Sequence, residues 1–119
     1  IAATRRNVRE RVARYMSGRP FLDPAKKCVV LTDDGLASGY TMLAAVESVR
    51  SLKPERIMVA VPTASASSAT RIAREVDECL CLNIRRGDRF SVAEAYRNWY
   101  DLDDREVLAE LQAYQGQSE

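Results

Sequence analysis

Residues 29–41 read Val-Val-Leu-Thr-Asp-Asp-Gly-Leu-Ala-Ser-Gly-Tyr-Thr, a strand followed by the approach to a helix. Together with Cys28, the first four residues form a continuous apolar, β-branched run, which is typical of a parallel strand buried on both faces. Asp33 and Asp34 follow directly, and small and hydroxylated residues lead on to Thr41. Because ligands bind beyond the carboxyl ends of the strands in an open parallel sheet, the segment after this strand is the candidate site.

The flanking sequence alternates helical and extended patterns. Thr4 is expected to cap the first helix, and Pro62 is expected to end the second strand. The predicted strands are 28–32, 57–61 and 79–84, and the predicted helices are 5–16, 42–52 and 67–76. A last helix is predicted to run to about Tyr114, with Asp103 or Asp104 as its cap. Connections long enough to hold helices indicate parallel pairing. We therefore expect an α/β fold with about three parallel strands and flanking helices.

The composition excludes several classes of protein. The 119 residues, 46% apolar and 29% charged, fit a single domain over residues 1–119. No apolar run reaches the roughly 18 residues of a membrane span, and no secretion signal is visible. The net charge of +1 argues against a dedicated nucleic-acid binder. Without any histidine, the chain cannot build a Ser-His or Cys-His nucleophile.

The three cysteines predict a reducing, cytoplasmic location. They are Cys28, Cys79 and Cys81, an odd number with no secretory leader. Cys79 and Cys81 alternate with leucines in a predicted strand, so both point to one face and are expected to be small buried residues. Their C-x-C spacing is not the C-x-x-C of a redox pair, and no histidine is present to complete a zinc site.

The loop after the first strand carries the chemistry. Two carboxylates at a strand end can accept hydrogen bonds from vicinal hydroxyls. The small residues, the hydroxyls of Ser38 and Thr41 and the free N–H groups of a helix N-terminus favour a phosphate. A ligand that carries neighbouring hydroxyls beside a phosphate is a ribose 5-phosphate, so this is the ligand that the segment predicts. The alternative is a strand-to-helix turn in which the two acids bind no ligand and only cap the turn.

The same segment resembles the PRPP-binding signature of type I phosphoribosyltransferases. That signature is an apolar strand, two acids, and then a small-hydroxyl-Gly-x-Thr loop. The resemblance covers roughly residues 10–84, and it includes Arg19-Pro20, the strand 57–61 with Pro62, and 76–82. It points to a prokaryotic branch of predicted phosphoribosyltransferases, and it implies their parallel, Rossmann-like sheet.

The resemblance also implies roles for individual residues. Asp33 and Asp34 correspond to the catalytic acids that bond the ribose hydroxyls. The residues of the loop that wraps the ribose 5-phosphate are Gly35, Ala37, Ser38, Gly39, Tyr40 and Thr41. The implied reaction transfers the phosphoribosyl group of PRPP to a nitrogen of a base or amine acceptor, as in nucleotide salvage. Mg²⁺ is carried with the pyrophosphate, and no protein metal site is expected.

The sequence departs from the family pattern at Thr32, Gly35 and Ser38, although Ser38 keeps the hydroxyl. The pyrophosphate loop and the flexible loop of this family precede the motif and are not in this chain. We therefore expect the C-terminal portion of a phosphoribosyltransferase-like domain, which is poorly active or inactive alone. Its open sheet edge is expected to be covered by a second copy or by an N-terminal segment.

Two other functions compete with the transferase. A phosphoacceptor receiver domain needs an Asp and a Lys at later strand ends. The later strands here end in Val61-Pro62 and Ile84-Arg85, with neither residue, so the sequence argues against this function. A non-catalytic sensor of PRPP or nucleotides with the same fold stays open as the alternative function.

Three further features have simple interpretations. The arginines of residues 5–14 are expected to form a solvated helix face. Residues 64–68 are expected to form a helix cap and turn, with a second anion site as the alternative. The aromatic cluster of Phe90, Tyr96, Trp99 and Tyr100 is expected in the core, with a wall that stacks on an acceptor base as the alternative.

Overall fold

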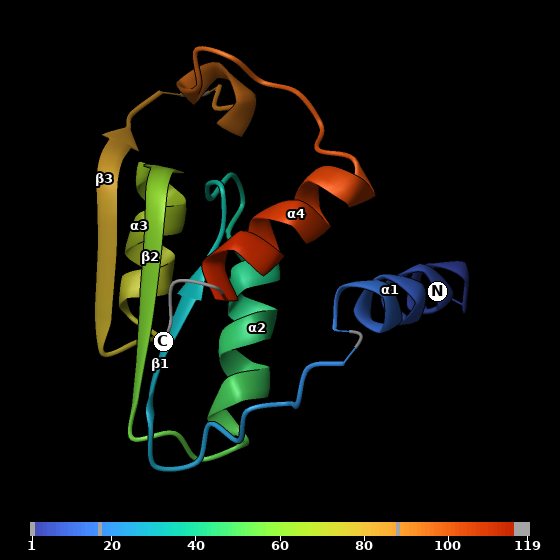
Figure 1. Cartoon of the computed structure of the whole chain (residues 1–119). Coiled ribbons are helices and arrows are strands. Elements are labelled where there is room, and N and C mark those ends of the chain that lie inside the picture. Colours follow the sequence, from blue (N-terminus) through green and yellow to red (C-terminus); the bar gives the residue numbers. More distant parts are fainter. Residues whose placement is uncertain (1, 17, 88, 116–119) are drawn as a thin grey trace. The chain divides into compact units, whose positions relative to one another are not determined.

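The computed structural model describes residues 2–16, 18–87 and 89–115. The chain forms two compact units, Asp23–Trp99 and the pair of segments Ile1–Leu22 and Tyr100–Glu119 (Figure 1). The expected single domain over residues 1–119 stays a prediction, because two such units can belong to one domain.

A three-stranded parallel sheet forms the centre of the unit Asp23–Trp99. The strands are β1 (Cys28–Thr32), β2 (Arg56–Ser65) and β3 (Glu78–Arg85), in the order β1-β2-β3. Val30 of β1 pairs with Met58 of β2, which pairs in turn with Glu78 of β3. The predicted α/β class and the parallel pairing are confirmed.

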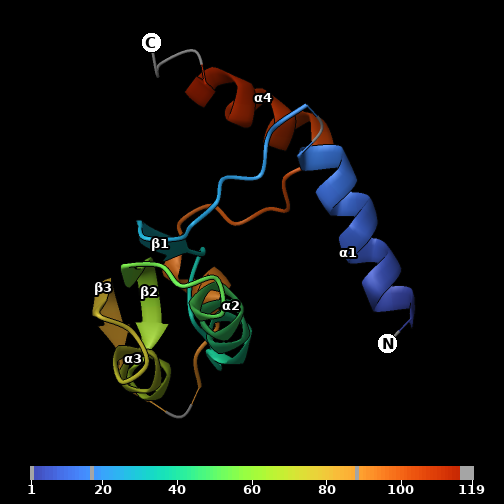
Figure 2. The same cartoon turned by 90° about the horizontal axis from the view of Figure 1, so that it is seen from below.

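Helices α2 (Tyr40–Arg50) and α3 (Ala66–Ala73) lie on the same side of this sheet (Figure 2). Their apolar side chains meet the side chains of one sheet face in a single core. The buried residues of this core are Leu36, Met42, Val46, Ile57, Val59, Val61, Ala64, Ala69 and Ile72. Both helices start at the carboxyl end of a strand, so this core fixes where the loops before them lie.

The prediction that β1 is buried on both faces is wrong for this unit. Its residues alternate between exposed and half-buried, and Val30 is 55% exposed. On β3, Leu82 is 89% exposed, whereas Cys79 and Cys81 pack against the core as half-buried residues. The reason is that α2 and α3 cover only one sheet face. Whether a second copy or an N-terminal segment covers the open edge of the sheet stays a prediction.

Strand β2 is longer than predicted. It continues through Pro62 to Ser65, because Val61 and Thr63 on either side of the proline both pair with β3. A proline interrupts only its own pair, and the pairing of β2 with β1 has already ended at Ala60. The extension carries Ser65 to the point where α3 begins.

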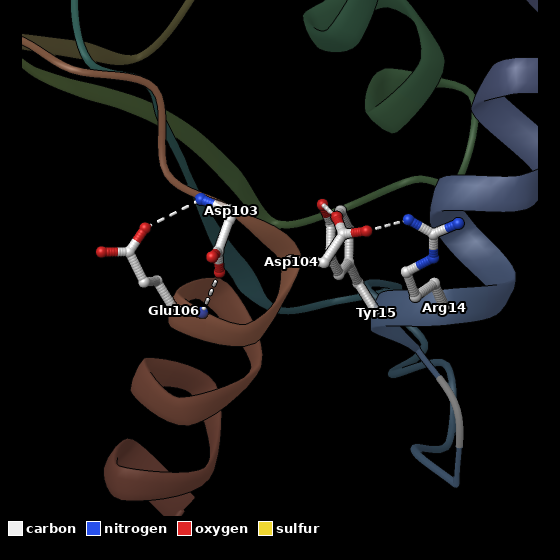
Figure 3. A network of polar contacts seen from close by, with 5 residues as sticks. All are labelled: Arg14, Tyr15, Asp103, Asp104 and Glu106. Atoms are coloured by element: carbon white, nitrogen blue, oxygen red, sulfur yellow. Dashed lines mark hydrogen bonds and ion pairs between the residues drawn. The ribbon is translucent and has the colours of Figure 1, made fainter.

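The other unit contains α1 (Ala2–Tyr15) and α4 (Asp104–Gln115). The Tyr15 hydroxyl donates a 2.6 Å hydrogen bond to Asp104, and the Arg14 guanidinium forms an ion pair with the same carboxylate (Figure 3). Helix α1 begins before Thr4, so the predicted cap at Thr4 is wrong. The predicted cap of the last helix is confirmed, because Asp103 and Glu106 exchange hydrogen bonds of 2.9 and 2.8 Å.

The aromatic residues do not form a core. Tyr96 and Trp99 pack with their ring centroids 5.3 Å apart, but they are 36% and 45% exposed. The arginine face of α1 is exposed, as expected. Among the described residues, no helix is both long and apolar enough to cross a membrane.

Candidate functional site

The acid pair lies directly after β1, as the sequence predicts. Both aspartates are exposed, and the Asp33 carboxylate accepts a 2.9 Å hydrogen bond from the Asp34 backbone N–H. Partial burial, and after it the negative charge of Asp33, raises the pKa of Asp34 above its ordinary value of 3.8. A carboxylate that binds its proton more tightly is also a stronger acceptor for a ligand hydroxyl.

The backbone at the acid pair is held by a residue from beyond β3. The Tyr96 hydroxyl donates a 2.5 Å hydrogen bond to the Asp34 carbonyl oxygen. Burial, followed by the charges of Asp34 and Asp33, raises the pKa of this phenol above 10.0. The phenol therefore keeps its proton, and with it this hydrogen bond, at neutral pH.

Gly35 is required by close packing rather than by an unusual backbone angle. A Cβ on this residue would lie 2.8 Å from a methyl of Val92 and 2.9 Å from the Thr63 methyl. Val92 begins the short 3-10 helix η1 (Val92–Ala95). The glycine thus allows η1 and β2 to close over the loop from two sides.

The loop then pairs with the end of β2 and turns into α2. Leu36 pairs with Ala64, through 3.0 Å hydrogen bonds from Leu36 N–H to Thr63 and from Ser65 N–H to Leu36. Gly39, the residue before α2, has a φ of 77°, which favours glycine. A Cβ there would also lie 3.1 Å from the Ser68 Cβ.

A cavity of about 160 Å³ opens on this loop. It is lined by Asp33, Gly35, Leu36, Ala37, Ser38, Gly39, Thr41, Met42 and Val92. Within the described part of the chain, no acceptor receives the backbone N–H groups of Ala37, Ser38 and Gly39. Unpaired N–H groups before a helix N-terminus, with serine and threonine side chains beside them, are what an anion requires.

Six of the eight predicted site residues line this cavity together, namely Asp33, Gly35, Ala37, Ser38, Gly39 and Thr41. Asp34 and Tyr40 do not line it. Tyr40 is 64% exposed, and the Arg71 guanidinium lies 4.6 Å from its ring centroid. Which of the eight bind a ligand stays a prediction.

Sequence reasoning missed the residues that support the site from elsewhere in the chain. Val92 lines the cavity, and Tyr96 holds the backbone of the acid pair, yet neither shows a sequence signal for this. Residues 64–68 were predicted to form a cap and turn, and within them Ser65 caps α3 by accepting a hydrogen bond from the Ser68 N–H. In addition, Ser65 and Ser68 contact the loop itself, where only a cap and turn were expected.

No metal centre is built into the described residues. Among them, no group of three or more His, Cys, Asp or Glu side chains is arranged to hold a metal ion. The acid pair offers two carboxylates at most. Mg²⁺ usually keeps several waters and binds through one or two carboxylates together with substrate phosphates, so the pair fits an ion that arrives with its substrate.

Comparisons with known proteins place this chain in a family. Two curated relatives, from Mycobacterium tuberculosis strains CDC 1551 / Oshkosh and ATCC 25618 / H37Rv, carry the name "Putative phosphoribosyl transferase". Each is 32% identical to this chain over 104 residues, which is 87% of this chain but 23% of the relative. The chain therefore spans about a quarter of the length of these relatives.

A solved structure gives the same fold. The crystal structure of TT1426 from Thermus thermophilus matches with a TM-score of 0.81 and 35% sequence identity, over 95% of this chain and 54% of that one. The family model of the phosphoribosyl transferase domain matches residues 2–95, which include the sheet, the acid pair and the cavity. This chain therefore belongs to the phosphoribosyl transferase domain family.

Proposed function

We propose that this chain binds the ribose 5-phosphate part of PRPP or of a nucleotide, as part of a phosphoribosyltransferase. The reaction moves the phosphoribosyl group to a nitrogen of a base or amine acceptor, and pyrophosphate leaves. Family membership supports the reaction class. The proposal for the ligand is argued from the cavity at residues 33–42.

The observation that carries this proposal is the meeting of two complementary features in one cavity. Three unpaired backbone N–H groups lie at Ala37, Ser38 and Gly39, with the N-terminus of α2 behind them. Asp33, which carries a carboxylate, lines the same cavity. A ligand with a phosphate at one end and hydroxyls at the other satisfies both, whereas a simple dianion would be repelled by the acid pair.

The acid pair has a second proposed task. Transfer of a phosphoribosyl group develops positive charge on the sugar as pyrophosphate departs. Carboxylates already in place stabilise such charge without reorganisation. Asp33 and Asp34 are therefore proposed both to bond the ribose hydroxyls and to stabilise the transition state.

Mg²⁺ is proposed to enter with the substrate. Carried with the pyrophosphate, it would neutralise negative charge on the leaving group. The protein would contribute at most the two carboxylates of the acid pair.

Calorimetric titration of the 119-residue chain with ribose 5-phosphate, and with PRPP plus Mg²⁺, tests the ligand. Asp34→Asn and Thr41→Ala are each expected to weaken binding by about tenfold. The first replaces a charged acceptor for the ribose hydroxyls by a weaker neutral one, and the second removes a hydroxyl donor to the phosphate. Glu47→Gln is the matched control, because it removes the same charge from an exposed position on α2. Loss of a negative charge alone should tighten binding of an anion, so weaker binding by Asp34→Asn identifies a direct contact.

The non-catalytic sensor differs in turnover, not in binding. A full-length protein that contains this segment is mixed with PRPP, Mg²⁺ and a panel of purine, pyrimidine and amine acceptors. Release of pyrophosphate that depends on the acceptor supports the transferase. Tight binding of PRPP with no release for any acceptor favours the sensor.

A further inference from the structure

We propose that Ser65, Ser68 and Arg71 are positioning residues that orient the peptide groups of the loop Leu36–Gly39 for phosphate. The inference rests on the proposed function, because it explains how the site described above is held ready. It adds three residues that lie outside the motif and outside the cavity lining.

Three consecutive carbonyl groups of the loop face α3. The Leu36 oxygen accepts hydrogen bonds from the Ser65 N–H at 3.0 Å and from the Ser68 hydroxyl at 2.9 Å. The Ala37 oxygen accepts a 2.9 Å hydrogen bond from the Ser65 hydroxyl. The Ser38 oxygen accepts a hydrogen bond from the Arg71 guanidinium.

The three supporting residues follow one another at intervals of three. Residues three apart lie on the same side of a helix, so the cap Ser65 and the α3 residues Ser68 and Arg71 form one row along the loop. Ser68 is fully buried, and Arg71 also lies over the Tyr40 ring. Each of the three loop carbonyl groups therefore has a side-chain partner in this row: Ser68 for Leu36, Ser65 for Ala37 and Arg71 for Ser38.

The direction of these carbonyl groups decides the direction of the N–H groups. A trans peptide is planar, and its C=O and N–H point to opposite sides. Holding the oxygens of Leu36, Ala37 and Ser38 toward α3 turns the N–H groups of Ala37, Ser38 and Gly39 away from it. Those residues line the cavity and no residue of α3 does, so these N–H groups are directed to the phosphate side.

Such positioning has an energetic purpose. Three N–H groups that point to the same side and have no acceptor repel one another, so a free loop would turn some of them away. Side chains that fix the opposite ends of the same peptides keep the arrangement without a ligand. The site is then preorganised, and binding does not have to order the loop.

Arg71→Met is the main test, because it keeps the stem of the side chain and removes the donor. We expect binding of ribose 5-phosphate to the 119-residue chain to weaken about tenfold, which is typical of a lost hydrogen bond from a charged group. Arg74→Met is the matched control, since it removes the same charge from the residue that follows α3. Its affinity should stay within about twofold of the wild type. Equal losses in both variants would mean a general charge effect and would overturn the inference.

The serines provide a rescue experiment. Ser65→Ala removes both the α3 cap and the hydrogen bond to Ala37, and Ser65→Thr keeps a hydroxyl for both. We expect about fivefold weaker binding for the alanine variant and recovery with threonine. Thr70→Ala, at an exposed α3 residue whose hydroxyl donates to Ala66 of the same helix, should bind as the wild type does. A Ser65→Ala variant that is folded and binds normally would contradict the inference.

A measurement without ligand separates this inference from the proposed function. In ¹H–¹⁵N spectra of the free chain, Arg71→Met should shift the amide signals of Ser38 and Gly39, and Arg74→Met should leave them in place. If these signals move but the wild type binds no ribose 5-phosphate, the proposed function fails and the positioning stands. If the wild type binds and neither the signals nor the affinity change in Arg71→Met, the positioning fails.

Discussion

The Tyr96 hydroxyl donates a 2.5 Å hydrogen bond to the carbonyl oxygen of Asp34, a residue 62 positions earlier in the chain. The bond joins the segment after β3 to the acid pair after β1. Val92, in the same segment, packs against the position of Gly35. The cavity is therefore bounded by a part of the chain that has no recognisable motif of its own.

Tyr96→Phe should weaken the attachment of the segment after β3 to the acid pair. It removes one hydrogen bond and leaves the ring on Trp99, so we expect the free energy of unfolding to fall by about 1 kcal/mol. Chemical denaturation measures this change, and titration with ribose 5-phosphate should show a binding loss of a few fold. Tyr100→Phe, at a more exposed tyrosine, serves as the control. Equal stability of Tyr96→Phe and the wild type would show that this hydrogen bond does not stabilise the fold.

Gly35→Ala should destabilise the chain through overpacking. The new Cβ would approach the Val92 and Thr63 methyl groups to less than 3.0 Å, and overpacking of this kind costs about 1–3 kcal/mol. Thermal unfolding measures the loss. The double variant Gly35→Ala with Val92→Ala makes room on one side and should recover part of the stability. No recovery in the double variant would mean that η1 does not pack on this loop.

Asp34→Asn should trade stability against binding. The raised pKa of Asp34 means that its ionised form is disfavoured in the folded state. The protonated carboxyl group of Asp34 therefore contributes stability that is fully present below the unfolded pKa. This contribution is lost as the pH rises through the folded pKa. Because the group is largely exposed, we expect Asp34→Asn to be more stable at pH 7 by less than about 1 kcal/mol. The gain should vanish near pH 3, as measured by melting temperature across the pH range. Glu47→Gln should show no such gain, and a less stable Asp34→Asn at pH 7 would contradict the prediction.

Asp104 should make the contact between α1 and α4 sensitive to acid. The hydrogen bond from Tyr15, and after it the positive charge of Arg14, lowers the pKa of Asp104 below its ordinary value of 3.8. A lowered carboxyl pKa gives stability that is present above the ordinary value and is lost as the pH falls through the lowered one. The NMR signals of the Tyr15 ring should therefore move at acid pH in the wild type and not in Asp104→Asn. Asp101→Asn is the control, and an unchanged acid transition in Asp104→Asn would refute the assignment.

The sequence predicted the local features of the fold well. The five-residue run from Cys28 is β1, the acids follow it, and the small residues lead into α2, because each of these depends on neighbouring residues alone. The errors at Thr4 and Pro62 concern element boundaries, where tertiary pairing overrides local preference. The prediction that β1 is buried on both faces was wrong, as the exposed Val30 shows, because strand composition does not reveal which face a helix covers.

The residues that contact the loop from other segments could not be predicted from the sequence, for a related reason. Val92, Tyr96 and Arg71 reach the loop only because the parallel sheet brings three strand ends together. Ser65 and Ser68 looked like a cap and turn, and they are that as well. Their second role depends on the backbone of Leu36 and Ala37, which no pattern in their own segment could indicate.

Calorimetric titration of this chain with ribose 5-phosphate, alongside Asp34→Asn, Thr41→Ala and the Glu47→Gln control, tests the proposed site most directly. We predict saturable binding by the wild type, about tenfold weaker binding by each of the two site variants, and unchanged or slightly tighter binding by the control. A folded wild-type chain that binds no ribose 5-phosphate, or site variants that bind as well as the control, would contradict the assignment of the cavity at residues 33–42.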